Sequence, residues 1–184
     1  MATMFRALLA LLTSLALAML SLRAPFAADA RDVERDPVRE AAMIHNIARF
    51  TQWPAGHFRS DSAPVLFCVG ATSGLKNALS AFPEKFVGAR PIRLVLLGQH
   101  DVPAACDVLF VDETLASRTR QQALRGIYGV VTVSDLPDFV GAGGHVGVFS
   151  ADGRLRFRID VPAARRSGIS FSSKLLGLGE VIGK

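Results

Sequence analysis

The sequence predicts an α/β fold, a three-layer sandwich in which a mostly parallel sheet of about six strands carries helices on both faces. Short, continuous apolar runs alternate with helical patterns along most of the chain, which is typical of parallel strands that are buried on both faces. Near the C-terminus, one apolar run alternates strictly with arginines and follows a tight-turn sequence. This combination indicates an antiparallel C-terminal hairpin.

The N-terminal residues have the pattern of a targeting segment. Arg6 supplies a positive charge, residues 7–22 form an apolar run, and residues 28–30 (Ala-Asp-Ala) are suited to cleavage. We therefore expect the following organisation: a cleaved signal peptide at residues 1–30 that directs export, a disordered lead-in at residues 31–36, and a single domain at residues 37–184. An uncleaved anchor is the alternative, and it would leave the domain on the same side of the membrane.

The domain is expected to begin with a helix over residues 37–51. Pro37 suits the first turn, where the missing N–H group would have no helical partner in any case. Apolar residues recur after it at helical spacing. Trp53-Pro54 ends the pattern because the residue before a proline disfavours helical geometry. Residues 56–64 are expected to form a loop.

Strands and helices are then predicted to alternate. The predicted strands are residues 65–70, 92–97, 108–111 and 130–133. The predicted helices are residues 75–81, residues 114–125 with Thr114 as the N-cap, and a helical turn at residues 136–140. Asp112 and Glu113 are expected to support the start of the helix at Thr114, because adjacent residues of an extended chain point apart and make a poor acid/base pair.

The last part of the domain is expected to hold the hairpin and a final helix. Gly143-Gly144 turns the chain into a strand at residues 146–149, and Ala151-Asp152-Gly153 has hairpin-turn chemistry. The next strand, residues 155–159, directs three apolar side chains to the core: Leu155, Phe157 and Ile159. A helix that begins at Ser172 is predicted to place four apolar residues on one side: Leu175, Leu176, Leu178 and Ile182.

Cys68 and Cys106 are the only cysteines. An even number of cysteines in an exported chain favours a disulfide, and both residues lie in strand-like segments. A bridge of this span contributes about 3 to 4 kcal/mol to stability when it is unstrained. Two buried free thiols are the alternative.

No pattern of catalytic or metal-binding residues emerges. The four histidines are too scattered to form a metal motif: His45, His57, His100 and His145. Ser134, Asp135 and His145 have the residue types of a hydrolytic triad but lack the usual G-x-S-x-G setting. We expect neither enzymatic activity nor a cofactor. The net charge of +5 is spread along the chain without a dense basic block, which argues against nucleic-acid binding.

One turn is a candidate ligand pocket. The sequence Gly70-Ala71-Thr72-Ser73-Gly74 follows a strand and precedes a helix, which is where α/β sheets bind ligands. Gly70, Ser73 and Gly74 are the candidate pocket residues. The turn lacks the Walker lysine and the dinucleotide glycine spacing, so an ordinary strand-to-helix turn is the favoured interpretation.

An ordered set of short segments spans nearly the whole predicted domain. The set comprises AAMIHNIARFTQWP at residues 41–54, FCVG at 67–70, CDVLF at 106–110, VTVSD at 131–135, Phe139, Gly143-Gly144, RFRI at 156–159 and SSKLL at 172–176. Taken together, these segments resemble the YfiR family of small periplasmic proteins. Asp160 departs from the family pattern, in which Asn is common at this position.

The resemblance implies a dimeric periplasmic repressor. Such a protein binds the periplasmic sensor region of an inner-membrane diguanylate cyclase and thereby lowers cyclic-di-GMP signalling and biofilm formation. The resemblance also implies that Cys68 and Cys106 can form a disulfide, while a second cysteine pair that is known in one member of the family is absent here. Lys174 is either an exposed contact to an acidic partner or a solvated helix position.

A second function remains open. A periplasmic small-molecule-binding module would use the edge of the sheet around Gly70, Ser73 and Gly74 as its pocket. The two interpretations differ in what the protein binds, which is a folded protein domain in the first and a small solute in the second.

Overall fold

The computed structural model describes residues 36–82, 85–98 and 100–183, which lie within one compact unit, Arg35–Lys184. The predicted signal peptide and most of the predicted lead-in lie outside the described residues. The last residue of that lead-in, Asp36, is the N-cap of the first described helix, because its carboxylate accepts hydrogen bonds from Val38 N and Arg39 N.

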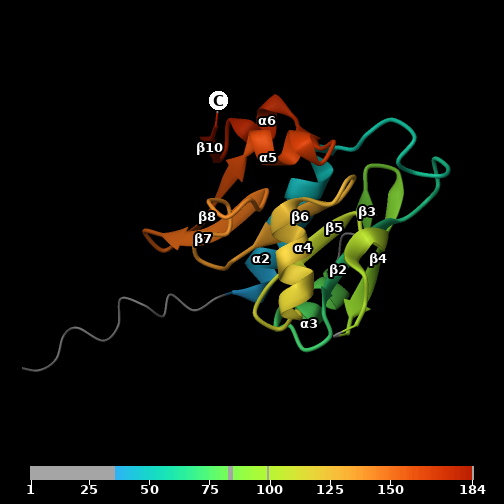
Figure 1. The fold of residues 1–184 in the computed structure, drawn as a ribbon, viewed down its shortest axis with the longest axis horizontal. Helices are drawn as coiled ribbons and strands as arrows, with labels where there is room; N and C mark the ends of the chain where they lie inside the picture. Colours follow the sequence, from blue (N-terminus) through green and yellow to red (C-terminus); the bar gives the residue numbers. More distant parts are fainter. Residues whose placement is uncertain (1–35, 83–84, 99, 184) are drawn as a thin grey trace, which may run out of the picture. The chain divides into compact units, whose positions relative to one another are not determined.

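The core of the fold is an eight-stranded sheet with the order β10-β8-β7-β6-β5-β2-β4-β3 (Figure 1). Its strands are β2 (Val65–Gly70), β3 (Phe86–Val87), β4 (Arg90–Leu97), β5 (Val108–Val111), β6 (Val131–Ser134), β7 (Val146–Ala151), β8 (Arg154–Asp160) and β10 (Glu180–Ile182). Neighbouring strands from β7 to β4 run parallel, whereas β3 pairs antiparallel with β4 and β8 pairs antiparallel with β7. The predicted mixed sheet is confirmed, with two more strands than expected.

Helices cover both faces of this sheet. The helices are α2 (Pro37–Arg49), α3 (Leu75–Ala81), α4 (Ser117–Arg125), α5 (Val161–Arg166), α6 (Ser173–Leu176) and the 3-10 turn η2 (Pro103–Ala105). One apolar core joins Ile44 and Ile47 of α2 to Phe67 of β2, and a second core on the opposite face joins Ala123 of α4 to Leu109 of β5. Figure 1 shows α4 crossing the face opposite to α2. The three-layer arrangement follows.

Several predicted elements match the structure closely. β2, α3 and β5 have the predicted bounds, and α2 ends two residues before the predicted end. Thr51–Gln52 instead forms a short strand, β1, which pairs antiparallel with β9 (Ser170–Phe171) in a separate two-stranded sheet. The chain leaves the helix at Phe50, so the segment before Trp53-Pro54 is extended, as the proline requires.

The predicted start of the helix at Thr114 is wrong. α4 begins at Ser117, and its N-cap, Ala116, makes no capping hydrogen bond through its side chain. Thr114 N instead donates to Asp112 Oδ1 at 3.0 Å, which closes a local turn. Asp112 therefore organises the turn before the helix and does not cap the helix. The helical turn predicted at residues 136–140 is also wrong, because those residues form non-helical turns with Asp138 at φ 55°.

The predicted C-terminal helix is much shorter than expected. α6 ends at Leu176, and Ser172 caps it by accepting from Leu175 N at 3.4 Å. Leu175 is buried, but Leu178 is 74% exposed, and Ile182 lies in β10. Gly179 allows the chain to pass close to the Phe157 ring, which a side chain at this position would overlap. The chain then runs parallel to β8 as an edge strand.

The predicted hairpin is confirmed. Ala151 pairs with Arg154, and the two residues between them, Asp152 and Gly153, have φ values of 52° and 70°. Both values are positive, as a type I′ turn requires. After β8, Asp160 accepts from Ala163 N at 2.7 Å and caps α5, a helix that the sequence analysis missed. Asn and Asp are comparably good N-cap residues, so either side chain suits this position.

Candidate functional site

Cys68 and Cys106 form a disulfide between the middle of β2 and the residue that follows η2. Their Cα atoms are 5.8 Å apart, and both residues are about 98 to 99% buried beneath α4 in the second apolar core. Cys106 N also donates to Pro103 O at 3.0 Å. The bridge therefore holds η2 against the sheet, and its burial restricts access by external thiols.

In the turn that was predicted to bind a ligand, the backbone N–H and the hydroxyl of Ser73 form hydrogen bonds within the turn itself and with the start of α3. Ser73 N donates to Gly70 O at 3.0 Å, and Ser73 Oγ accepts from Leu75 N at 3.3 Å. Gly70 is required where it stands, because a side chain there would overlap the hydroxyl of Thr114. The two cavities described below are lined by other residues. A ligand at Gly70, Ser73 and Gly74 stays a prediction.

His145 lies in a buried polar network. Its Nδ1 accepts from Thr132 N at 3.2 Å, so the neutral ring carries its proton on Nε2, which donates to Ser167 Oγ at 3.1 Å. Burial lowers the pKa of His145 from 6.5 to about 4, an effect that Asp160 partly offsets and Arg166 reinforces. A ring that donates to a serine cannot also remove its proton, so this pair has the wrong polarity for nucleophilic catalysis.

Ser134 is engaged elsewhere. Its hydroxyl donates to Val111 O at 2.5 Å and accepts from Leu136 N at 3.0 Å, which ties β6 to β5. Ser134 and His145 therefore direct their hydrogen bonds to different partners and do not form the triad that their residue types permit. Within the described ranges, no group of three or more His, Cys, Asp or Glu residues is placed to hold a metal ion.

A surface hollow of about 390 Å³ lies at the amino ends of β5 and β6. We call it the Tyr128 hollow. Its lining residues come from the η2 segment, the end of α4 and the following turn: Val102, Pro103, Gln122, Arg125, Gly126, Ile127 and Tyr128. It therefore lies at the opposite edge of the sheet from the predicted turn at Gly70–Gly74.

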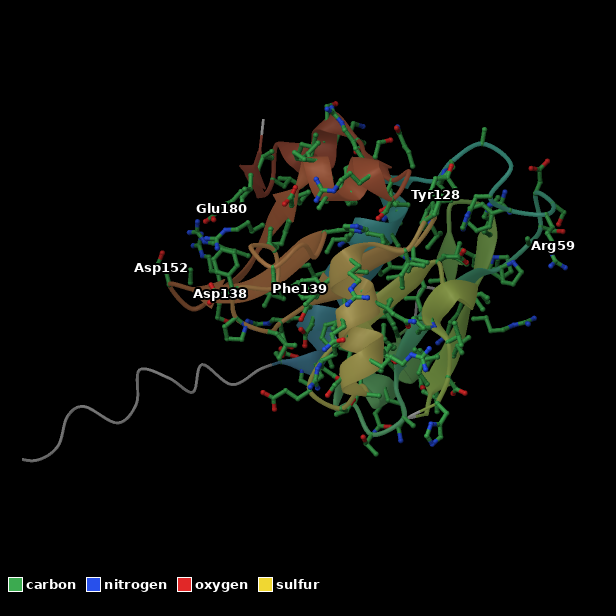
Figure 2. All side chains as sticks on the ribbon, in the orientation of Figure 1. Arg59, Tyr128, Asp138, Phe139, Asp152 and Glu180 are labelled. Atoms are coloured by element: carbon green, nitrogen blue, oxygen red, sulfur yellow. A yellow bond between two sulfur atoms is a disulfide. The ribbon has the colours of Figure 1, made fainter. Side chains whose placement is uncertain are left out.

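Two of the most exposed large apolar side chains line the Tyr128 hollow. Tyr128, which Figure 2 labels, is 73% exposed, and Val102 is 66% exposed. The Tyr128 ring lies over Gly168, where an added Cβ would come within 2.7 Å of Tyr128 Cε2. Arg125 is exposed at the rim and forms no ion pair with any residue of the described segments. An apolar hollow with an aromatic residue and an arginine has the composition of a protein-binding hot spot.

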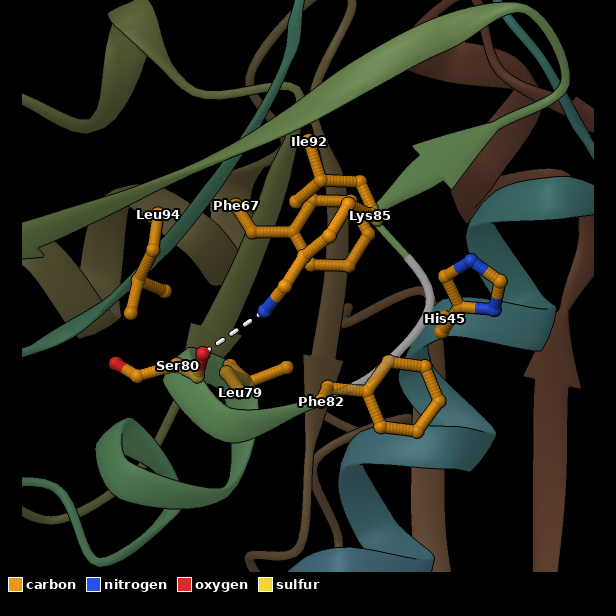
Figure 3. Close-up of a pocket in the computed structure, with 8 residues that line it drawn as sticks. All are labelled: His45, Phe67, Leu79, Ser80, Phe82, Lys85, Ile92 and Leu94. Atoms are coloured by element: carbon orange, nitrogen blue, oxygen red, sulfur yellow. Dashed lines mark hydrogen bonds between the residues drawn. The ribbon is translucent and has the colours of Figure 1, made fainter.

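A second cavity, which we call the α2–α3 pocket, lies between α2, α3 and β4 and has a volume of about 90 Å³ (Figure 3). Its lining residues are mostly apolar: His45, Phe67, Leu79, Ser80, Phe82, Lys85, Ile92 and Leu94. His45 Nε2 donates to Phe86 O at 2.8 Å, which fixes the ring between α2 and β3. Lys85 Nζ donates to Ser80 O at 2.8 Å.

Lys174 lies on α6 with an exposed side chain. It forms no ion pair among the residues that the structure describes. This placement is compatible with both interpretations of Lys174, a partner contact and a solvated position. No helix in the described part of the chain is both long enough and apolar enough to cross a bilayer.

Sequence analysis did not find the Tyr128 hollow or the α2–α3 pocket. Each is assembled from segments that are separated in the chain, and isolated exposed apolar residues such as Val102 are ordinary in folded proteins. The only sequence signal at the hollow is the rarity of tyrosine, since Tyr128 is the one tyrosine of the chain.

Comparison with known proteins identifies a family. A family model, DUF4154, described as YfiR/HmsC-like, matches residues 38–180, which is well over half of the chain. The match begins in α2 and ends in β10, so it includes every described strand of the large sheet at least in part. No curated protein matches the chain.

Proposed function

The chain belongs to the YfiR/HmsC-like family, a regulatory rather than a catalytic family, and from this premise we propose that it is a periplasmic repressor of a membrane-bound diguanylate cyclase. In this proposal, the domain binds the periplasmic sensor region of the cyclase and lowers the production of cyclic-di-GMP, and with it biofilm formation. The observation that carries the proposal is the family match across residues 38–180.

We assign the cyclase contact to the Tyr128 hollow. Tyrosine and arginine are enriched among the residues that dominate binding energy at protein interfaces, and this hollow presents one of each beside Val102. A hollow of this kind accepts an apolar anchor from the partner, while Arg125 attracts an acidic group at its edge. Lys174 supplies a second contact if the partner is acidic there.

Repression requires a difference in affinity between two states of the partner. The repressor must bind the inactive state of the sensor region more tightly than the active state, because equal binding would leave their ratio unchanged. A signal that weakens binding then releases the cyclase. The buried disulfide holds η2, whose Pro103 lines the hollow, so the integrity of the disulfide supports the shape of the binding surface.

The test is retention of envelope proteins on the immobilised protein, followed by mass spectrometry. We expect the wild-type protein to retain an inner-membrane diguanylate cyclase from detergent-solubilised envelopes. Tyr128→Ser should reduce this retention at least about tenfold, the loss typical of an interface hot spot. The matched control is Leu178→Ser, because Leu178 is 74% exposed and Tyr128 is 73% exposed.

Three outcomes would count against parts of the proposal. Absence of any cyclase under both oxidising and reducing conditions would argue against the repressor. Equal loss of the cyclase in the two serine variants would remove the assignment to the Tyr128 hollow. Retention that is unchanged in Lys174→Ala would favour a solvated position for Lys174. We also propose a homodimer, which light scattering of the purified protein tests directly.

A further inference from the structure

The α2–α3 pocket has the construction of a small ligand site. Five apolar side chains form its walls: Phe67, Leu79, Phe82, Ile92 and Leu94. Phe67 is 2% exposed and belongs to the main core, so the floor of the pocket reaches the protein interior. Since a water molecule takes up about 30 Å³ of the liquid, a volume of about 90 Å³ has room for three or four non-hydrogen atoms.

One cation stands at the rim of this pocket. Lys85 is exposed, and its ammonium group donates to the neutral carbonyl of Ser80 at 2.8 Å (Figure 3). Within the described segments, the ammonium has no carboxylate partner. His45 contributes a buried wall, because it is 2% exposed and its Nε2 is directed at Phe86 O. Among the described residues that line the pocket, Lys85 is the only lysine or arginine.

We propose that the α2–α3 pocket binds a small carboxylate with an apolar tail of about four carbons. The tail lies against Phe67, Ile92 and Leu94, and the carboxylate accepts a hydrogen bond from Lys85 Nζ. A charge-assisted bond to a carboxylate is stronger than the present bond to a neutral carbonyl, so the ammonium exchanges Ser80 O for the ligand. Burial of so short a tail gives a Kd on the order of millimolar. The proposal is independent of the proposed function.

The test is a titration of the full chain, observed through the methyl NMR signals of Leu79, Ile92 and Leu94. The probes are pentanoate, 1-pentanol and 1-aminopentane, which share one tail and differ in charge. All methyl shifts should saturate with pentanoate, and 1-pentanol should bind roughly two- to fivefold more weakly, as expected for one exposed ion pair. 1-Aminopentane should bind most weakly of the three.

Two variants test separately the contribution of the apolar walls of the pocket and the contribution of the Lys85 charge. Lys85→Gln should make pentanoate and 1-pentanol bind equally while 1-pentanol keeps its wild-type affinity. Leu79→Phe should fill the pocket and abolish binding of all three probes, and Leu96→Phe is its matched control. Leu96 is 46% exposed on β4 and does not line the pocket.

Two results would overturn the proposal. One is the absence of saturable shifts at Leu79, Ile92 and Leu94 with tens of millimolar pentanoate. The other is a preference for pentanoate that survives Lys85→Gln. Since Lys85 is exposed, its variant should fold, so this second result remains decisive even if Leu79→Phe fails to fold.

Discussion

His57 Nε2 lies 2.6 Å from Asp107 Oδ1, across 50 residues of chain. The other carboxylate oxygen, Asp107 Oδ2, accepts from Leu66 N at 2.6 Å. The carboxylate of Asp107, a residue that is 7% exposed, therefore fixes the start of β2 and the loop before it to the residue that precedes β5. The His57 ring also stacks on Trp53 and meets Phe58 edge to face, which anchors this loop at the amino edge of the sheet.

Replacement of Asp107 should be costly. Asp107→Ala leaves Leu66 N and His57 Nε2 without their acceptor, and we expect the free energy of unfolding to fall by about 2 to 4 kcal/mol. Asp107→Asn keeps one acceptor oxygen and should lose roughly half as much. Urea denaturation measures both changes. Asp101→Ala is the control, because Asp101 accepts a single exposed bond from Gly98 N, and an equal loss there would contradict the prediction.

Removal of the disulfide should lower stability by about 4 kcal/mol, as the entropy of closing a loop of this length predicts. The loop joins residues with a sequence separation of 38. The Cys68→Ala/Cys106→Ala variant and the reduced wild-type protein should show similar urea midpoints. Dithiothreitol should leave the double variant unchanged. A loss below about 1 kcal/mol would show that the unfolded chain is already constrained in this region.

We expect the protein to lose stability as the pH falls from neutral to weakly acidic, because protonation of His145 favours the unfolded state. Because its folded pKa, about 4, lies below the ordinary histidine value of 6.5, the unfolded state binds more protons between these values. The stability contributed by neutral His145 is therefore present at neutral pH and is lost as the pH falls through this window. Between pH 7 and pH 5, we expect a loss of about 2 kcal/mol in the free energy of unfolding.

The His145→Gln variant isolates this effect. It should be less stable at pH 7 because it loses part of the network with Thr132 and Ser167. Its stability should also decline less than that of the wild-type protein between pH 7 and pH 5. Parallel pH profiles for the two proteins would instead assign the acid sensitivity to other groups.

Gly144 is constrained by packing. An added methyl group at this position would overlap the ring of Phe139, which is 4% exposed and has no room to withdraw. Gly144→Ala should therefore lower the free energy of unfolding by about 1 to 3 kcal/mol, measured by thermal unfolding. Gly74→Ala is the control, because a Cβ there meets no atom within 4 Å and the backbone has φ −60°. If the two variants are equally stable, the ring of Phe139 must move at little cost.

The sequence predicted a structural element correctly where a single segment contained both a start or turn signal and a regular apolar pattern. α2 combined Pro37 with a regular apolar face, and the hairpin at Asp152-Gly153 combined turn chemistry with strict alternation, so both were predicted. β3 and β10 are edge strands of two and three residues, too short for a periodicity to develop. α5 was missed although Asp160 and Pro162 gave the signals of a helix start.

The candidate sites were less predictable because they depend on contacts between distant segments. The disulfide was predicted from a simple count of cysteines in a chain that was expected to be exported. The Tyr128 hollow required Val102, which precedes β5, and Tyr128, which precedes β6, to line one surface, and the α2–α3 pocket required β4 to lie beside α3. Neither juxtaposition leaves a local pattern in the sequence.

β2 is paired unequally with its two neighbours in the large sheet. β2 aligns six residue pairs with β4 but only two with β5. The Asp107 carboxylate and the Cys68–Cys106 bridge both cross the shorter ladder. Without the covalent bond, we expect the short β2–β5 ladder to open more readily, so amide hydrogen exchange along it should be faster in the reduced protein than in the oxidised protein.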